Sequence, residues 1–550
     1  MKTIFKLIVF FTLLGLNYGY SQTYSEILGR PTDVSINLSL LFNQHVDVYA
    51  EYGTISGNYS QSTTPITNVV NIPNHIDLTN LQPNTKYYYR TRYRQTGVGT
   101  YLMGTEHSFY TQRAVGSTFT FTVEADVHLY DKKGCENEYK IALANQAADH
   151  PDFMIDMGDT YGDDHNPFTI TSAQVDSLHK VYRPLLGSIC HSIPYYFCVG
   201  NHEGEKRYYL LQTPPNNLGI YATLARKKYF ANPVPNSFYT GDTLHEGYGM
   251  GQPENYYAWT WGNALFVVMD VYRYDNDTTE KPVKWDWTIG LPQYTWLKNT
   301  LEGSTAQYKF VFAHHVSGEG RGGAVQAHFY EWGGYENNGT TFGFTTKRPG
   351  WAKPIHQLFV DNGVNIFFQG HDHLFAHEEL GGVIYQEVPM PSDSTYEIGM
   401  VANADAYTAD TIGGSGHLRV TVSPVCVKVD FVRAYLPIDT LSGVHHNREV
   451  AFSYTIGDCS TLNVPPVKAI TKMNLYPNPS ANVLYVSLTD MATQNAIIKI
   501  YNTMGQEVYT DTFSTSTNLK INTGNLPNGV YTVLIETKES IYSDKFIKVY

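Results

Sequence analysis

Five short apolar segments of the sequence each end in residues that can bind a metal ion or move a proton. The segments lie at residues 119–125, 153–157, 194–199, 310–313 and 364–369. The clusters that follow them are, in order, Asp126-Val127-His128, Gly158-Asp159, Gly200-Asn201-His202-Glu203, His314-His315 and Gly370-His371-Asp372-His373. Short apolar runs of this kind are typical of buried strands, and open α/β sheets bind ligands at the carboxyl ends of their strands. We therefore expect the five clusters to form one site.

The side chains in these clusters suit a pair of transition-metal ions. Imidazole together with carboxylate fits Fe, Zn or Mn, whereas Ca and Mg prefer sites made of oxygen atoms. The clusters offer too many donors for one ion with an open catalytic position, but they suit two ions that share a carboxylate. In Asp126-x-His128 and His371-x-His373, residues i and i+2 of an extended segment would face the same side and converge.

Two such ions suit the hydrolysis of a phosphate ester. Two metals about 3.5–4 Å apart can clamp the attacking and leaving oxygens of an in-line displacement at phosphorus. They also lower the pKa of a bound water toward about 7, which supplies hydroxide at neutral pH. The clusters thus predict a phosphohydrolase in which metal-bound hydroxide attacks phosphorus.

The order D-x-H, G-D, G-N-H-E, H-H and G-H-D-H resembles that of the calcineurin-like metallophosphoesterases. The region from about residue 115 to 455 is most similar to their purple acid phosphatase branch. The resemblance implies an α/β fold, a four-layer αββα sandwich. It also implies that one metal is held by Asp126, His128, Asp159 and His373, and the other by Asp159, Asn201, His314 and His371, with Asp159 as the bridge. His202 would lie beside the phosphate as proton donor or transition-state stabiliser, a usual histidine role.

The sequence departs from the purple enzymes at two positions. Those enzymes carry a tyrosine ligand three residues after the bridging aspartate, where this chain has Gly162, and Tyr161 falls one residue short. They also lack the histidine found here at His128. We therefore predict a colourless centre without a tyrosinate–iron bond. The family pattern favours His314 over His315 as the ligand, which leaves His315 as a supporting or substrate contact.

A glycine-rich stretch directly follows the His314-His315 motif. Residues 317–350 contain nine glycines together with Arg321 and several aromatic residues. Long loops of this kind in a compact domain are usually functional or disordered. One interpretation is a loop over the substrate in which the planar fork of Arg321 holds a phosphate oxygen. The alternative is an arginine that solvates a flexible loop.

The composition narrows the function and the compartment. Of 550 residues, 38 are Lys or Arg and 51 are Asp or Glu, which gives a net charge of −13 and argues against nucleic-acid binding. Residues 1–21 read as a secretory signal, with Lys2 and Lys6 before the apolar stretch at 7–16. No other run approaches the ~20 apolar residues of a transmembrane helix. We therefore expect a protein that is secreted or attached to the cell surface.

Two further domains flank the catalytic region, which we place at 115–460. Residues 22–114 alternate short strand-like runs with turns, and Leu81-x-Pro83-x-Thr85-x-Tyr87 resembles the tyrosine corner of fibronectin type III-like domains. Such a β-sandwich often precedes the catalytic domain in purple acid phosphatase-like enzymes. An unrelated β-sandwich is the alternative.

The tail resembles a known export signal. After a predicted linker at 461–470, the series Leu475-Tyr476-Pro477-Asn478-Pro479, Leu526-Pro527-Asn528-Gly529 and a terminal Lys545-Phe546-Ile547-Lys548-Val549 is similar to the type A sorting domain of the type IX secretion system. Residues 471–550 would then address the chain to that machinery. The alternative is an accessory adhesion or carbohydrate-binding module.

Two questions stay open from the sequence. The leading function is a phosphomonoesterase acting on a phosphorylated small molecule; the alternatives are a phosphodiesterase or nucleotide hydrolase with the same centre, or a surface binding protein without turnover. The five cysteines, at 135, 190, 198, 426 and 459, are odd in number. An oxidising compartment would permit a bridge such as Cys190–Cys198, but the spacing does not fix the connectivity.

Overall fold

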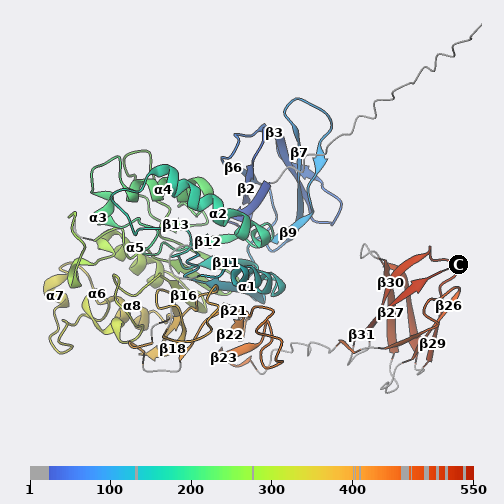
Figure 1. Ribbon diagram of the computed structural model, residues 1–550. Helices are drawn as coiled ribbons and strands as arrows, with labels where there is room; N and C mark the ends of the chain where they lie inside the picture. Colours follow the sequence, from blue (N-terminus) through green and yellow to red (C-terminus); the bar gives the residue numbers. More distant parts are fainter. Residues whose placement is uncertain are drawn as a thin grey trace, which may run out of the picture. The chain divides into compact units, whose positions relative to one another are not determined.

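The computed structural model describes residues 24–549, apart from gaps at 130–133, 276–277, 400–401, 403, 408–410, 460–469, 472, 488–494, 503–506, 515–517 and 537–540. The predicted signal sequence and the predicted linker, except residue 470, lie outside these residues. The chain divides into two compact units, residues 1–459 and 460–550 (Figure 1). Among the described residues, no helix is both long and apolar enough to cross a membrane.

The first unit contains a mixed sheet of nine strands. Their order is β23 (Val450–Gly457), β22 (Cys426–Arg433), β21 (Gly416–Val422), β10 (Phe119–Glu124), β11 (Phe153–Asp156), β12 (Tyr195–Phe197), β1 (Tyr24–Gly29), β2 (Ile36–Phe42) and β6 (Asn74–Leu78). The strands β10, β11 and β12 are parallel, and β21 runs antiparallel to β10. Three of the five apolar segments form these parallel strands, so the loops that follow them meet at one edge.

A second mixed sheet of eight strands carries the other two segments. Its order is β13 (Thr240–Gly241), β14 (Tyr257–Trp261), β15 (Ala264–Val268), β16 (Tyr308–Phe312), β17 (Ile366–Gln369), β19 (Val383–Glu387), β18 (Phe375–Leu380) and β20 (Thr411–Ile412). The strands β15, β16, β17 and β19 are parallel. The loops after β16 and β17 therefore also leave from a common edge.

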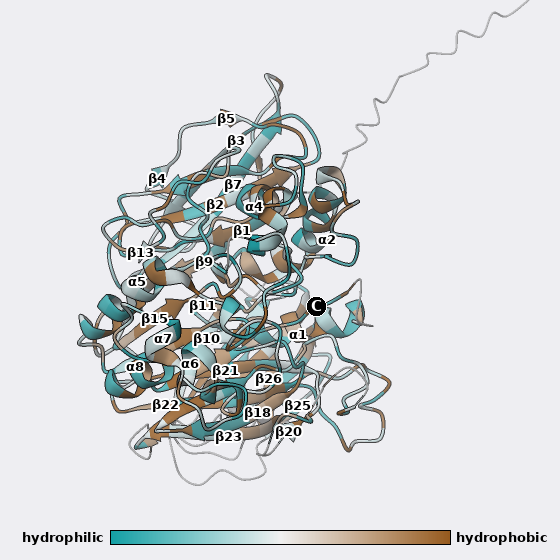
Figure 2. Ribbon diagram, turned by 90° about the vertical axis from the view of Figure 1, so that its left-hand side faces the viewer, coloured by the Kyte–Doolittle hydropathy of each residue, from teal (hydrophilic) through white to brown (hydrophobic). Residues whose placement is uncertain are grey.

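The two sheets pack face to face, and helices cover their outer faces. Phe121 of β10 stacks on Phe153 and meets Phe266 of the second sheet edge-on, with ring centroids 5.6 and 5.1 Å apart. In Figure 2 the central strands β10, β11 and β15 are largely brown, the colour of hydrophobic residues. The helices α1 (Glu136–Ala148) and α2 (Ser172–Cys190) pack on the first sheet, and α5 (Gly290–Glu302), α6 (Tyr330–Gly333) and α8 (Ile355–Asp361) pack on the second. This confirms the predicted four-layer αββα sandwich.

Three other short helices connect these layers. They are α3 (Arg207–Leu210), α4 (Leu218–Tyr229) and α7 (Phe344–Lys347). Asn217 begins α4, and its side chain accepts a hydrogen bond from the amide of Ile220. Thr171 begins α2 with a reciprocal capping box, in which Gln174 returns the contact. The α2 helix thus starts at a defined residue beside the loop that follows β11.

The segment before the catalytic sheets is a β-domain that continues into them. A six-stranded sheet comprises β4 (Gln61–Ser62), β3 (Val46–Gly53), β7 (Lys86–Gln95), β8 (Leu102–Met103), β5 (Ile66–Thr67) and β9 (His107–Tyr110). It packs on β1, β2 and β6 through a common core. The hydroxyl of Tyr87 accepts a hydrogen bond from the amide of Gln82, as a tyrosine corner would. However, β1 also pairs with β12, so one sheet runs through both regions.

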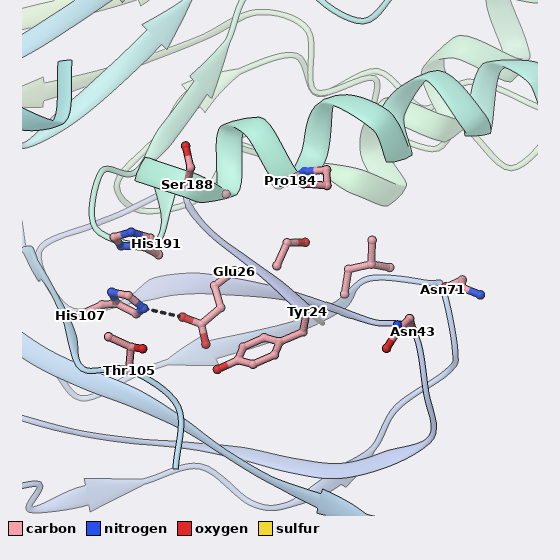
Figure 3. A pocket seen from close by; sticks show the side chains of 12 residues that line it. Tyr24, Glu26, Asn43, Asn71, Thr105, His107, Pro184, Ser188 and His191 are labelled. Atoms are coloured by element: carbon pink, nitrogen blue, oxygen red, sulfur yellow. Dashed lines mark ion pairs between the residues drawn. The ribbon is translucent and has the colours of Figure 1, made fainter. Parts of the chain in front are cut away.

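A cavity lies where this β-domain meets α2. It has a volume of about 520 Å³ and is shown in Figure 3. Glu26 of β1 is 5% exposed and accepts a hydrogen bond from the hydroxyl of Thr91. Its carboxylate lies 3.4 Å from Nε2 of His107, whose ring stacks on that of His191 at the end of α2. A buried acid and two imidazoles therefore connect the β-domain to the catalytic region.

The second unit consists of two β-sheets around a small core of its own. One has the order β24 (Ile470–Thr471), β31 (Ile541–Lys548), β30 (Gly529–Glu536), β27 (Asn495–Asn502) and β28 (Glu507–Ser514). The other has the order β25 (Asn474–Tyr476), β26 (Val483–Ser487) and β29 (Asn518–Asn522). Leu484, Ile500, Val533 and Phe546 are fully buried between them. The expected β-rich tail is confirmed.

The disulfide differs from the pairing considered from the sequence. Cys426 is bonded to Cys459, whereas Cys190 and Cys198 are buried free thiols. Cys190 lies in the core under α2, and Cys198 lies in the core between the two sheets. These cores are on opposite faces of the first sheet, so the two thiols do not pair. The Cys190–Cys198 bridge considered from the sequence is therefore wrong.

Candidate metal centre

The predicted ligands leave their strands in strained backbone conformations. Asp126, His128, Asp159, His371 and His373 have positive φ angles of 62°, 42°, 56°, 82° and 64°. Side chains with a Cβ rarely adopt this region, and such residues cluster at functional sites. Asp126 and His128, and likewise His371 and His373, are therefore not residues i and i+2 of an extended segment, and that expectation is wrong. Asp126 and His128 still meet in one group of donors, whereas His371 and His373 belong to two different groups.

One group of donors gathers around Asp126. Its Oδ1 atom lies 3.6 Å from Nε2 of His128 and 3.6 Å from Nε2 of His373. His128 Nε2 lies 3.6 Å from Oδ2 of Asp159 as well. Asp126, His128 and His373, together with Asp159, are the four residues that the family resemblance assigns to the first metal.

A second group also includes Asp159. Nε2 of His314 lies 3.2 Å from Asp159 Oδ2, and Nδ1 of His371 lies 2.8 Å from Oδ1 of Asn201. Ligand atoms of Asp159, His314 and His371 all lie within 4.8 Å of one another. Asp159 is thus shared by both groups, which is the position expected of a bridging carboxylate.

The arrangement fits cations better than it fits an ordinary buried hydrogen-bond network. Oδ1 of Asp126 is buried and accepts no hydrogen bond within the described part of the chain. Buried polar atoms are almost always hydrogen-bonded, so such atoms indicate a missing partner. Nδ1 of His314 lies 2.8 Å from the carbonyl oxygen of Met157, to which it can donate, and this leaves Nε2 as a metal donor.

Glycines allow the loops to approach each other at this point. A Cβ at Gly200 would lie 2.4 Å from Oδ1 of Asp159, and a Cβ at Gly370 would lie 2.6 Å from Oδ2 of Asp126. No side chain fits at these distances. The glycines of the G-N-H-E and G-H-D-H motifs therefore make room for the carboxylates.

Backbone amides and a buried glutamate hold the carboxylates in place. Glu203 accepts hydrogen bonds from the amides of Asp159, Thr160 and Gly200. Burial, followed by repulsion from Asp159, raises its pKa to about 7. Asp126 in turn accepts a hydrogen bond from the amide of His371. The loops after β10, β11, β12 and β17 are thereby tied to one another.

The charges of the site stabilise each other. Burial lowers the pKa of His314, but attraction to Asp159 and Asp126 outweighs it and raises the pKa to about 9. Burial raises the pKa of Asp159, yet the same histidine and His202 hold it well below its usual range. Clustered carboxylates thus attract positive charge, which protons provide here and metal ions would provide when bound.

His202 lies beside the donors and is held by residues that the sequence did not reveal. Its amide donates to Asp159, and its Nδ1 lies 2.8 Å from Asp164. Nζ of Lys206, only 3% exposed, donates to Asp164 and to Glu319 of the glycine-rich stretch. Lys206 and Glu319 could not be predicted from the sequence, because their spacing from the motifs gives no signal.

The position that would hold the purple-enzyme tyrosine cannot accept a side chain. A Cβ at Gly162 would lie 2.1 Å from the carbonyl oxygen of His202. Tyr161 points elsewhere: its ring is buried and stacks on Phe197 and Phe230, with centroids 4.6 and 4.9 Å apart. Neither residue offers a phenolate to the donor groups, and the colourless centre stays a prediction.

The predicted substrate residues lie in different surroundings. Arg321 is exposed and lines a pocket of about 550 Å³ together with Asn201, His202 and His371. Asp372 accepts hydrogen bonds from the amide of Gly322, the residue after Arg321, and from the hydroxyl of Tyr407. It thereby orients the loop that carries Arg321. His315, by contrast, is fully buried. Its ring lies 4.8 Å from that of His371, which favours a supporting role over substrate contact.

Comparisons with known proteins agree with this geometry. Residues 119–375 match the calcineurin-like phosphoesterase family, and residues 474–549 match the secretion system C-terminal sorting domain. The structure of PhoD has a TM-score of 0.55 and 16% sequence identity, covering 79% of this chain and 90% of that chain. Purple acid phosphatase PPD1 from yellow lupin (Lupinus luteus) seeds has a TM-score of 0.53 and 16% identity, covering 79% and 74%. No curated protein matches.

The two low-identity structures show the fold, and the family match shows the chemistry. Two of the three groups of residues that could hold a metal contain Asp159, and one of these also contains His202, which the family motifs do not assign as a ligand. The sorting domain shows that the protein is exported, to the medium or to the cell surface. The chain is therefore a calcineurin-like metallophosphoesterase that carries a C-terminal sorting domain of the type IX secretion system.

Proposed function

We propose that this metallophosphoesterase is a phosphomonoesterase. The observation that supports it is the charge of the pocket beside the donors. Lys206, Lys281 and Arg321 contribute three positive charges against the two negative charges of Asp164 and Glu319, which leaves +1. The chain as a whole carries −13. A local positive patch favours the more highly charged monoester, which carries up to about two negative charges near neutral pH, over the singly charged diester.

The metal donors are proposed to be Asp126, His128, Asp159 and His373 for one ion and Asp159, Asn201, His314 and His371 for the other. When bound, Fe, Zn or Mn ions would supply Lewis acidity that polarises a phosphoryl oxygen and makes water acidic enough to attack at neutral pH.

The protein's own groups bind the phosphate and move the proton. Arg321, which makes no ion pair or hydrogen bond within the described residues, is proposed to hold a phosphoryl oxygen with its planar fork. His202 is proposed to donate a proton from Nε2 to the leaving oxygen. The hydrogen bond between its Nδ1 and Asp164 supports this role, because it fixes the ring and stabilises the protonated form.

The proposal is tested with two chromogenic substrates. The purified protein, reconstituted separately with Zn, Mn and Fe, is assayed on 4-nitrophenyl phosphate and bis(4-nitrophenyl) phosphate, with and without chelator. We expect kcat/KM for the monoester to be at least tenfold higher, and both activities to disappear with chelator. A preference for the diester would make the protein a phosphodiesterase.

A further inference from the structure

The pocket beside the donor cluster is larger than a phosphate group needs. Its volume is about 550 Å³, within the range of about 300–1,000 Å³ that holds drug-sized ligands. Asn201, His202 and His371 form the part nearest the metal donors. The remaining lining comes from the loop before α2, from Lys206 and α3, from the segment at 279–281, and from Glu319 and Arg321 of the glycine-rich stretch. A substrate whose phosphate sits at the donors would place its leaving group in this remaining space.

The rim of the pocket presents an aromatic ring to solvent. Phe168 is 73% exposed. The turn that carries it is ordered, because the amides of Thr169 and Ile170 both donate to the carbonyl oxygen of Asn166. The α2 helix begins directly afterwards at its capping box. The backbone that carries Phe168 is therefore fixed at the pocket, and most of the side chain's surface faces water.

Neighbouring residues fix one edge of this ring and leave a face open. Phe168 meets Tyr209 edge-on, with ring centroids 6.3 Å apart. Tyr209 is itself buried, and its hydroxyl lies 3.4 Å from Asp164, the partner of His202. The same rim carries Lys281, whose exposed side chain forms an ion pair with Glu319 and keeps further N–H donors on its ammonium. An exposed aromatic face beside polar donors suits a planar aromatic ligand.

We propose that this pocket is a leaving-group subsite for phosphate monoesters that carry a planar aromatic ring, which stacks on Phe168. The proposal rests on the proposed phosphomonoesterase function and names its substrate class. Nucleoside monophosphates and aryl phosphates share this chemistry. Lys281 distinguishes them, because only the nucleoside offers it sugar hydroxyls and base acceptors.

The test compares substrates with and without a ring in one set of variants. Phe168→Ala should lower kcat/KM for phenyl phosphate and for a nucleoside 5′-monophosphate by roughly fivefold or more, the effect of losing one aromatic contact. It should leave glycerol phosphate unchanged. Phe168→Trp should restore both aromatic substrates, and Phe342→Ala, which removes an exposed ring outside the pocket, should change none. An additional loss for the nucleotide alone on Lys281→Ala would identify the nucleoside as the preferred ligand.

A binding measurement separates this proposal from the proposed function. Titration calorimetry with phenylphosphonate and methylphosphonate should show tighter binding of the phenyl compound, and Phe168→Ala should remove the difference. If that holds but monoesters are not hydrolysed, the subsite stands and the phosphomonoesterase assignment fails. If monoesters are hydrolysed but Phe168→Ala affects ring-bearing and ring-free compounds equally, the subsite is overturned and the phosphomonoesterase stands.

Discussion

Asn201 gives a direct test of the proposed second metal, because its side chain is one of the proposed ligands. Its amide oxygen and Nδ1 of His371 point at each other over 2.8 Å, because both are directed to the same place. Asn201→Ala removes one donor without a charge change and leaves the β12 strand intact. We expect the second ion to bind at least about tenfold more weakly, since even supporting contacts of a metal are worth tenfold to a hundredfold.

Metal analysis of dialysed protein checks this expectation. The wild-type chain should keep two ions per molecule, and the variant should keep about one after the same dialysis. Asn216→Ala, in the turn before α4 and away from the donors, serves as the control. Unchanged metal content in the Asn201 variant would show that this side chain is not a ligand.

Arg321 provides a second test at the scale of one side chain. Because it lies in the pocket and has no ion-pair partner among the described residues, its charge is available to the substrate. Arg321→Ala should raise KM for a phosphate monoester about tenfold, in line with the loss of a charge-assisted hydrogen bond of about 1.5–3 kcal/mol. Lys347→Ala, an exposed cation later in the same stretch, should change nothing. Equal kinetics for both variants would rule out the clamp.

The residues that could be predicted from the sequence are those that lie next to a strand end. Asp126, Asp159, His314 and His373 follow apolar segments directly, so their convergence follows from the parallel strands. The left-handed backbone of these loops could not be predicted, because it depends on contacts across the site. Lys206 was missed for a related reason. Its partners Asp164 and Glu319 are distant in sequence, and a buried ammonium is recognisable only once all three meet.

At the scale of elements, Lys206 connects the loop after β12 to two others. It binds Asp164 in the loop before α2 and Glu319 in the glycine-rich stretch that carries Arg321. Removing its charge by Lys206→Met leaves two largely buried carboxylates without their shared cation. Breaking a buried pair in this way costs about 3–5 kcal/mol. We expect a loss of stability and a drop in kcat, because His202 and the Arg321 loop both lose their support.

A double-mutant cycle separates the two effects. Glu319→Gln alone should cost less, and the double variant should be more stable than the sum of the single changes predicts, by about 1–3 kcal/mol. Thermal unfolding and kcat on a phosphate monoester are measured for all four proteins. Additive effects on both quantities would show that Lys206 does not couple the two loops.

The junction between β1 and α2 makes stability depend on pH. Burial raises the pKa of Glu26 to about 7, against the opposing hydrogen bonds from Thr91 and Tyr89. Burial also lowers the pKa of His107 to about 3, so this imidazole stays neutral at higher pH. Between about pH 4.5 and 7 the folded protein therefore holds a proton that the unfolded chain has released. The contribution of Glu26 to stability therefore falls as the pH rises through this range, whereas the contribution of His107, which the unfolded chain protonates below about pH 6.5, rises between about pH 3 and 6.5.

Glu26→Gln should remove this dependence. At pH 8 the variant should be more stable than the wild type by up to about 3 kcal/mol, and at pH 4.5 the two should be equal. Urea unfolding at several pH values measures the difference. Glu136→Gln, on an exposed part of α1, is the matched control. A wild-type stability that does not fall between pH 4.5 and 8 relative to Glu26→Gln would contradict the assignment of the buried proton.

At the scale of the whole molecule, the β-rich tail could be predicted from the sequence, but the strand pairing that joins the first β-domain to the catalytic sheet could not. The tail motifs at 475–479 and 526–529 lie in a separate β-unit with its own core, as expected for a sorting domain. The front of the chain is less separate than the predicted boundary at residue 114 implies. The contact between Gly29 and Tyr195 that joins β1 to β12 is one backbone pairing, which no sequence pattern specifies.

The separate tail leads to the last prediction. The disulfide between Cys426 and Cys459 holds the end of the first unit beside β22, so β23 at the edge of the sheet is anchored before residue 460. A chain that ends at Cys459 should therefore fold with its disulfide and hydrolyse phosphate esters within about twofold of the full chain.

In cells that contain the secretion system, the same truncation should leave the activity inside the cell, because the residues that match the sorting domain are missing. Activity measured in medium and in cell extract, for the full chain and the truncation side by side, gives both results. A truncated protein that appears in the medium would mean that the tail is not the export signal, and one that is inactive after purification would mean that the catalytic unit needs the tail to fold.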